Sequence, residues 1–144
     1  MALCRRRKRV LIVCTGNTCR SQMAEGLIDH VLGDAWEVRS AGTEPGEAVH
    51  PLAIEVMREA GIDISGKKPE HVDRYLGQRW DLVVTVCDGA AATCPVFPGG
   101  NERIHVGFPD PAEARGSREE RLAVFRKVRD AIAERLLPEV ERRT

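Results

Sequence analysis

The stretch Val10-Leu-Ile-Val-Cys-Thr-Gly-Asn-Thr-Cys-Arg-Ser21 decides how the rest of this 144-residue chain is interpreted. Its first four residues are apolar and three of them are β-branched, which is typical of a buried β-strand. Cys14 lies where that strand should end, and Gly16 and Asn17 follow, two residue types that tolerate unusual backbone angles. Helical spacing begins at Arg20 and Ser21, so the sequence predicts a tight loop between a strand and a helix.

A loop of this kind suits an oxyanion. Backbone N–H groups of residues 15–20 can turn inward to form an anion-binding nest, and the following helix adds unpaired N–H groups and its positive dipole end. The guanidinium of Arg20 fits a tetrahedral oxyanion. The same positive field favours the thiolate of Cys14, so we expect its pKa to fall. A buried structural cysteine before an ordinary turn is the alternative. The lysine of nucleotide-binding P-loops is absent, which argues against ATP or GTP.

The residues Cys14-Thr-Gly-Asn-Thr-Cys-Arg-Ser21, followed by Gln-Met-Ala-Glu25, resemble the signature loop of the low-molecular-weight tyrosine phosphatase superfamily. Within it the similarity is greatest to thioredoxin-coupled arsenate reductases, and it extends from about Arg9 to Leu137. The resemblance implies that Cys14 is the nucleophile. It also implies that arsenate, with phosphate or sulfate as competing anions, is bound by Thr15, Gly16, Asn17, Thr18, Cys19, Arg20 and Ser21.

Composition narrows the function classes. Lys and Arg number 22, as do Asp and Glu, so there is no net basic field to attract nucleic acid. Apolar runs are too short to cross a bilayer, and the length favours one domain. Five cysteines without an export signal predict reduced thiols in the cytoplasm. We expect residues 1–8 to be a flexible basic tail, with a nucleic-acid or membrane patch as the alternative, and residues 9–144 to form a monomeric domain.

Alternating periodicities predict strands at 10–13, 36–39, 81–86 and 103–106 and helices at 21–32, 51–61, 69–76 and 117–137, with Pro138 and the charged tail after the last helix. We expect Val31 and Val124 on the inward faces of their helices. This alternation is typical of an α/β domain with a parallel sheet. In the spatial order 2-1-3-4 the first and third strands are neighbours. Cys14 and Cys87 would then lie together at the carboxyl ends, beneath the loop that follows the fourth strand.

Cys87 and Cys94 are separated by six residues. A structural pair is one interpretation, and a metal site is another, although the commoner Cys spacing is absent. Reduction of arsenate takes two electrons, which two thiols supply when they close to a disulfide. Together with the resemblance, this favours a relay in which Cys14 attacks arsenate, Cys87 attacks Cys14, and Cys94 attacks Cys87. Thioredoxin would then reduce the final disulfide.

Residues 88–93 contain three alanines, which favour a helix. Helical rise would separate Cys87 from Cys94 by about 10 Å. A disulfide requires Cα atoms within about 7 Å, so such a helix must unwind on oxidation.

Asp110-Pro111 follows the last predicted strand. On pattern alone Asp110 is a turn residue, but the resemblance matches it to a general acid that protonates the leaving oxygen. A tyrosine phosphatase acting through a phospho-Cys14 intermediate is the alternative function, although Ala112-Glu113-Ala114 replaces the aromatic residues that such enzymes carry after Asp-Pro. A third hypothesis is a non-catalytic thiol sensor that binds arsenite or a metal.

The resemblance also raises the question of a potassium ion. Some family members hold one behind the loop, and Asn17, Glu25 and Ser40 match that arrangement, whereas Glu70 stands where Asp is usual. No cofactor is otherwise expected. Asn17 is expected to order the loop through its side chain, and Ser21 to stabilise the thiolate. Neither Cys19 nor Cys4 is assigned a step.

Overall fold

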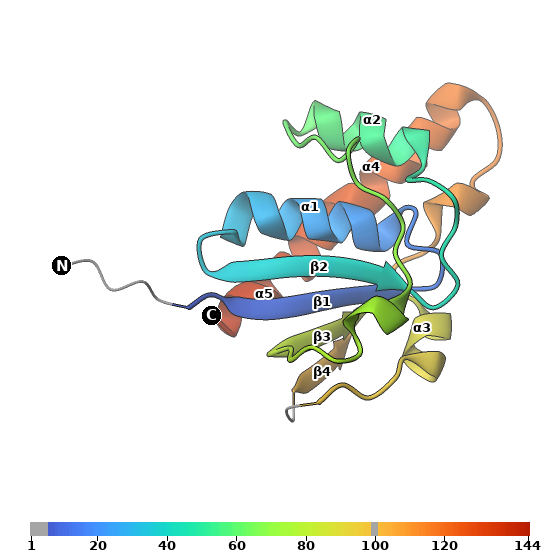
Figure 1. The fold of residues 1–144 in the computed structure, drawn as a ribbon. Coiled ribbons are helices and arrows are strands. Elements are labelled where there is room, and N and C mark those ends of the chain that lie inside the picture. Colours follow the sequence, from blue (N-terminus) through green and yellow to red (C-terminus); the bar gives the residue numbers. More distant parts are fainter. Residues whose placement is uncertain (1–5, 99–100) are drawn as a thin grey trace.

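A parallel sheet in the order β2-β1-β3-β4 forms the centre of the molecule, as Figure 1 shows, and this confirms the predicted order. The computed structural model describes residues 6–98 and 101–144. In them the strands are β1 (Lys8–Cys14), β2 (Trp36–Gly42), β3 (Leu82–Thr85) and β4 (Glu102–His105). The helices are α1 (Arg20–Leu32), α2 (Pro51–Glu59), α3 (Asp88–Thr93), α4 (Arg118–Arg135) and α5 (Leu137–Arg142), with two 3₁₀ turns, η1 (Val72–Tyr75) and η2 (Pro111–Glu113).

The register of β1 explains why it is so apolar. Ile12 pairs with Ser40 of β2 on one side and with Val84 of β3 on the other. Residues 10–13 are completely buried, as expected for a central strand covered on both faces. All four strands run the same way, so the loop after β1 and the helix α3 after β3 lie at the arrowhead end of the sheet in Figure 1.

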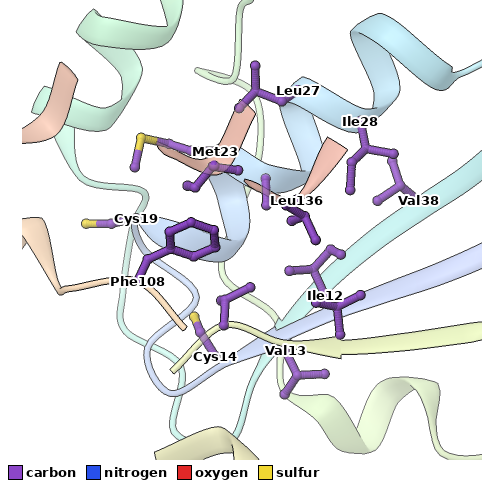
Figure 2. Close-up of a cluster of buried hydrophobic side chains, with 14 of the residues drawn as sticks. Ile12, Val13, Cys14, Cys19, Met23, Leu27, Ile28, Val38, Phe108 and Leu136 are labelled. Carbon is purple, nitrogen blue, oxygen red and sulfur yellow. The ribbon is translucent and has the colours of Figure 1, made fainter. Parts of the chain in front are cut away.

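The main core lies where α1 and α4 pack against each other and α1 packs against β2. Figure 2 shows Ile12 of β1 facing a cluster from α1 and the end of α4, which includes Met23, Ile28 and Leu136. Two of the residues expected in this core are outside it: Val31 is 53% exposed and Val124 is 37% exposed. Both lie at the margin of an apolar stripe, where helical spacing alone does not separate buried from exposed positions.

Several element boundaries differ from the prediction. Lys8, which we assigned to the tail, is the first residue of β1, and β2 continues to Gly42. The helix expected at 69–76 is only the 3₁₀ turn η1. The helix expected to run to about Leu137 ends at Arg135, and Pro138 lies in the first turn of a separate helix, α5, where its missing N–H breaks no helical hydrogen bond.

The start of α4 follows the prediction. Ser117 and Glu120 form a capping box, in which each side chain accepts a hydrogen bond from the other's backbone N–H. Within the described ranges, the structure contains no helix of the length and apolarity that a membrane crossing requires.

Gly42, at the end of β2, allows the strand to approach the loop after β1. A Cβ atom on Gly42 would lie 2.4 Å from the Thr15 carbonyl oxygen. We predict that Gly42→Ala lowers the free energy of unfolding by about 1–3 kcal/mol, because backbone must move to admit the methyl group. Urea unfolding measures this. Gly77→Ala is the control, since a Cβ there meets nothing within 4 Å. Equal midpoints for both variants would contradict the prediction.

Candidate active site

The loop between β1 and α1 surrounds a cavity of about 240 Å³ at the carboxyl end of the sheet. Residues 14–20 and Asp110 line it, so the structure brings the predicted nucleophile, arginine and acid together. The Met23 N–H donates to the Cys19 carbonyl, which continues the first turn of α1 directly from the loop. The loop therefore has the strand-to-helix geometry that suits an anion.

Asn17 holds the loop in shape. It is fully buried, and its φ of 54° makes it the one residue other than glycine with positive φ in the described ranges. Its amide nitrogen donates to Ser21 Oγ at 2.6 Å and to Ser40 Oγ at 3.0 Å. Its amide oxygen accepts from Gln22 Nε2 at 3.1 Å and from the Glu70 N–H at 2.9 Å. These are the side-chain hydrogen bonds that we expected to order the loop.

Cys14 lies beneath the cavity, and its sulfur is buried beside Phe108 and the core cluster (Figure 2). The sulfur is 2.8 Å from Ser21 Oγ and accepts a hydrogen bond from the Asn17 N–H at 3.0 Å. Burial raises the pKa of the Cys14 thiol, while the hydrogen bonds from Ser21 and Asn17 act in the opposite direction. The expected net lowering of this pKa is therefore wrong for the structure described, because burial is the largest effect on the sulfur.

Arg20 explains part of that difference. One guanidinium nitrogen donates to the Phe108 carbonyl at 3.1 Å, and the other lies 3.9 Å from Asp110 Oδ2. Its charge is thus directed toward the loop that follows β4 rather than toward sulfur. Asp110 in turn accepts a hydrogen bond from the Ala112 N–H at 3.0 Å. These contacts draw the loop after β4 over the cavity, as the strand order predicted.

Cys87 lies next to the loop. Thr15 Oγ1 is 3.3 Å from Cys87 Sγ, and the same sulfur accepts from the Ala90 N–H at 3.4 Å, which caps α3. Together with Arg20 and Asp110, Thr15 and Cys87 line a second cavity of about 590 Å³. The predicted proximity of Cys87 to the Cys14 loop is therefore present, with Thr15 as the intermediate contact.

Cys94 lies at the opposite end of α3 and is half-buried. Its N–H donates to the Ala90 carbonyl at 2.8 Å, so the helix is intact up to this residue. Burial raises the pKa of the Cys94 thiol, and the positive charge of Arg103 opposes that rise. Cys87 and Cys94 are both free thiols, held apart by one short helix.

Cys19 lines the cavity above Cys14 but is assigned no step in the chemistry. Burial raises the pKa of Cys19 to about 12, so it stays protonated near neutral pH. Cys4 lies outside the described residues. No group of three or more His, Cys, Asp or Glu side chains that could hold a metal occurs in the ranges that the structure covers.

The residues matched to a potassium site do not fit the ion. The Lys67 ammonium lies 2.6 Å from Glu25 Oε2, and the other oxygen of Glu25 accepts from Ser40 at 2.6 Å. Asn17 turns its amide nitrogen, not its oxygen, toward Ser40. Glu70 instead pairs with Arg74 at 2.6 Å. A cation of the chain itself already neutralises the carboxylate on which a potassium ion would depend.

The sequence analysis assigned no role to three groups that bond to predicted site residues: Lys67, which bonds to Glu25; the Phe108 carbonyl, which accepts from Arg20; and Gln22, which donates to Asn17. Gln22 Nε2 donates to both oxygens of Asn17 and to the Lys68 carbonyl. Each contact joins residues from different elements, and none carries a periodic or motif signal. Only Gln22, directly after the loop motif, could have been suspected, as a polar residue on the inward face of a helix.

Comparisons with known proteins identify the family of this chain. The model of the family described as low molecular weight phosphotyrosine protein phosphatase matches residues 9–142. The arsenate reductase of Halalkalibacterium halodurans is 52% identical over 130 residues, which cover 90% of this chain and 93% of that protein. The arsenate reductase of Bacillus subtilis is 48% identical over 129 residues, covering 90% and 92%.

Solved structures extend the similarity. An arsenate reductase in the reduced state superposes with a TM-score of 0.77 at 34% identity, covering 94% of this chain and 98% of that one. An arsenate reductase in the phosphate binding state superposes with a TM-score of 0.71 at 32% sequence identity, covering 94% of this chain and 98% of that one. The thioredoxin-dependent arsenate reductase of Corynebacterium glutamicum superposes with a TM-score of 0.68 at 28% sequence identity, covering 99% of this chain and 66% of that one. The chain therefore belongs to the low molecular weight phosphotyrosine protein phosphatase family and, within it, to the arsenate reductases.

Proposed function

We propose that this chain reduces arsenate to arsenite through Cys14, Cys87 and Cys94, and that thioredoxin restores the thiols. The observation that carries the proposal is the contact of Thr15 Oγ1 with Cys87 Sγ, because it sets a second thiol beside the loop of Cys14. A third thiol, Cys94, ends the helix that Cys87 begins. The arsenate reductases to which the chain is similar support the choice of substrate.

In the first step arsenate occupies the cavity above Cys14, where Arg20 and the loop N–H groups bind its oxygens. The Cys14 thiolate, stabilised by Ser21 Oγ and the Asn17 N–H, attacks arsenic. A sulfur–arsenic bond forms and one arsenic–oxygen bond breaks. Asp110, on the rim of the same cavity, gives the proton with which that oxygen leaves as water.

In the second step the Cys87 thiolate attacks Cys14 Sγ. A disulfide forms while the sulfur–arsenic bond breaks, and its electron pair stays on arsenic, which leaves as arsenite. Cys94 then attacks Cys87 Sγ and releases the Cys14 thiolate. The dithiol of thioredoxin then reduces the Cys87–Cys94 disulfide, so thioredoxin supplies two electrons for each arsenate reduced. We place this cycle in the cytoplasm, where thioredoxin keeps thiols reduced.

The alternative is a tyrosine phosphatase that would use the same Cys14, Arg20 and Asp110 but hydrolyse a phospho-cysteine with water. Two observations favour reduction. Cys87 lines the second cavity, together with Thr15, Arg20 and Asp110, and would have no part in hydrolysis. Residues 112–114, which follow Asp110-Pro111, are Ala-Glu-Ala and offer no aromatic surface for a tyrosine ring.

We predict that Cys14→Ser, Cys87→Ser and Cys94→Ser each lower turnover roughly 10³-fold or more, because removal of any member of a covalent sequence stops the cycle. The measurement is arsenate-dependent oxidation of NADPH in the presence of thioredoxin and thioredoxin reductase. Cys4→Ser is the matched control and should keep the normal rate. Loss in Cys14→Ser alone would favour single-cysteine chemistry instead of the relay.

Asp110→Asn is expected to lower kcat about 10²-fold or more while the Kd for arsenate changes little, since the amide cannot supply a proton to the leaving oxygen. Turnover and calorimetric titration with arsenate separate the two quantities. Glu113→Gln provides the control, as its carboxylate lines the neighbouring cavity without a role in the proposed steps. If kcat is unaltered in Asp110→Asn, the acid is another group.

Oxidation should unwind α3. Cys87 and Cys94 flank six helical residues, so helical rise keeps them about 10 Å apart, beyond the reach of a disulfide. We expect amide exchange across residues 88–98 to be faster in the Cys87–Cys94 disulfide form than in the reduced form. Exchange in β1 is the internal control. Equal protection of 88–98 in both forms would rule out the rearrangement.

A further inference from the structure

An arginine of β4 binds the end of the helix that separates the two relay cysteines. The two terminal nitrogens of the Arg103 guanidinium donate to the Pro95 carbonyl at 3.1 Å and to the Cys94 carbonyl at 3.2 Å. Both carbonyls lie just beyond Thr93, the last helical residue of α3. Arg103 therefore holds the backbone that carries the Cys94 thiol.

A second contact from β4 reaches the other end of α3. His105 follows Arg103 by two residues, so the two side chains leave the strand on the same face. His105 Nε2 lies 3.2 Å from Asp88 Oδ1, and its Nδ1 lies 2.8 Å from Thr85 Oγ1. Because an ionised carboxylate can only accept, the Nε2 atom carries the hydrogen of that contact. One face of β4 thus binds both ends of α3.

Apolar packing holds the same segment only weakly. Val86 and Phe97, which flank it, are both buried in the core. Within residues 88–96, Ala90 is the one fully buried residue, and Val96 is 84% exposed. A segment with so little buried apolar surface opens at a low cost in free energy. The polar contacts from β4 therefore account for much of what keeps Cys94 in its position.

The guanidinium of Arg103 suits this task better than an ion pair. The acidic residue beside it, Glu102, pairs with Arg143 at 2.9 Å. The planar fork of a guanidinium matches two oxygen acceptors that lie close together. Removing the fork would leave the Glu102–Arg143 pair in place and expose two carbonyls to water, so a substitution at Arg103 changes this contact alone.

We propose that Arg103 is a positioning residue, which favours the dithiol over the Cys87–Cys94 disulfide by holding Cys94 at the far end of α3. Cys94 reaches Cys87 only when its backbone leaves the helix end, and that movement breaks both hydrogen bonds from Arg103. The two bonds therefore stabilise the reduced form and not the oxidised one. Before substrate binds, this arrangement leaves Cys87 available to Cys14.

The purpose of this contact rests on the proposed function, in which Cys87 has to react with Cys14 before it reacts with Cys94. The redox equilibrium of Cys87 and Cys94 requires neither arsenate nor Cys14. It can therefore be measured in a Cys14→Ser background, so the failure of this inference and the failure of the proposed function are separate results.

The test is the equilibrium between the Cys87–Cys94 dithiol and its disulfide in glutathione buffers at pH 7. The protein dithiol gives two electrons and two protons to one glutathione disulfide, which becomes two glutathione thiols. Peptide mass spectrometry after acid quenching and alkylation measures the bridged fraction. We expect Arg103→Gln to raise the equilibrium constant for bridging about threefold to tenfold, since two exposed hydrogen bonds from a charged donor are lost from the dithiol form alone.

Arg79→Gln is the matched control, because it removes an exposed guanidinium that precedes β3, at the opposite end of the sheet. Its bridged fraction should equal that of the unsubstituted residue. The charge of Arg103 also lowers the pKa of the Cys94 thiol, but burial keeps that pKa above its ordinary value, so the thiol is protonated at pH 7 in both forms. An unchanged bridged fraction in Arg103→Gln overturns the proposal, as does an equal rise in Arg79→Gln.

Amide exchange in the reduced form gives a second readout. The Cys94 N–H donates to the Ala90 carbonyl, and in Arg103→Gln it should exchange faster by a factor similar to the change in the bridging equilibrium. Exchange in β1 should not change. A merely structural role of Arg103 would instead lower the melting temperature, speed exchange throughout the sheet and leave the bridged fraction as it was. Unaltered exchange at Cys94 would also overturn the proposal.

Discussion

The structure depends on one asparagine in the left-handed conformation. A positive φ is unfavourable for any residue other than glycine, and Asn17 adopts it at a fully buried position. Four side-chain hydrogen bonds, to groups from α1, β2 and the segment before η1, oppose that cost. The conformation also turns the Asn17 N–H onto Cys14 Sγ. Loop shape, thiol environment and the packing of three elements are therefore set by one side chain.

The parallel sheet supplies the second constraint. Because β1 and β3 are neighbours and run in the same direction, the residues that follow them meet at one edge. This brings two thiols together without either residing on a long loop. The same packing buries Cys14, and burial raises the pKa of its thiol. The hydrogen bonds from Ser21 and Asn17 act in the opposite direction and stabilise the thiolate. The packing at the carboxyl end of the sheet therefore both places the anion loop beside Cys87 and buries the sulfur of Cys14.

Much of this could be predicted from the sequence, and the reasons differ by residue. The run at 10–13 and the loop motif carry local information, so the strand and the loop follow from them, while the parallel sheet follows from the alternation of strands and helices along the chain. The Lys67–Glu25 pair joins residues 42 positions apart through an irregular segment, for which no periodicity exists. The Phe108 carbonyl sets the direction of the Arg20 side chain, and α5, whose first turn contains Pro138, packs against α4 and α1. Such features arise from tertiary contacts that override local preference.

The capping of α3 has a consequence for the timing of the proposed relay. The sulfur of Cys87 accepts the Ala90 N–H and so closes the first turn of the helix. When that sulfur becomes bonded to a second sulfur, it loses thiolate character and is drawn toward the loop, so it becomes a poorer acceptor. The helix would then lose its N-terminal support at the moment when Cys94 has to travel. Bond formation at one end of the segment would thereby lower the barrier to motion at the other.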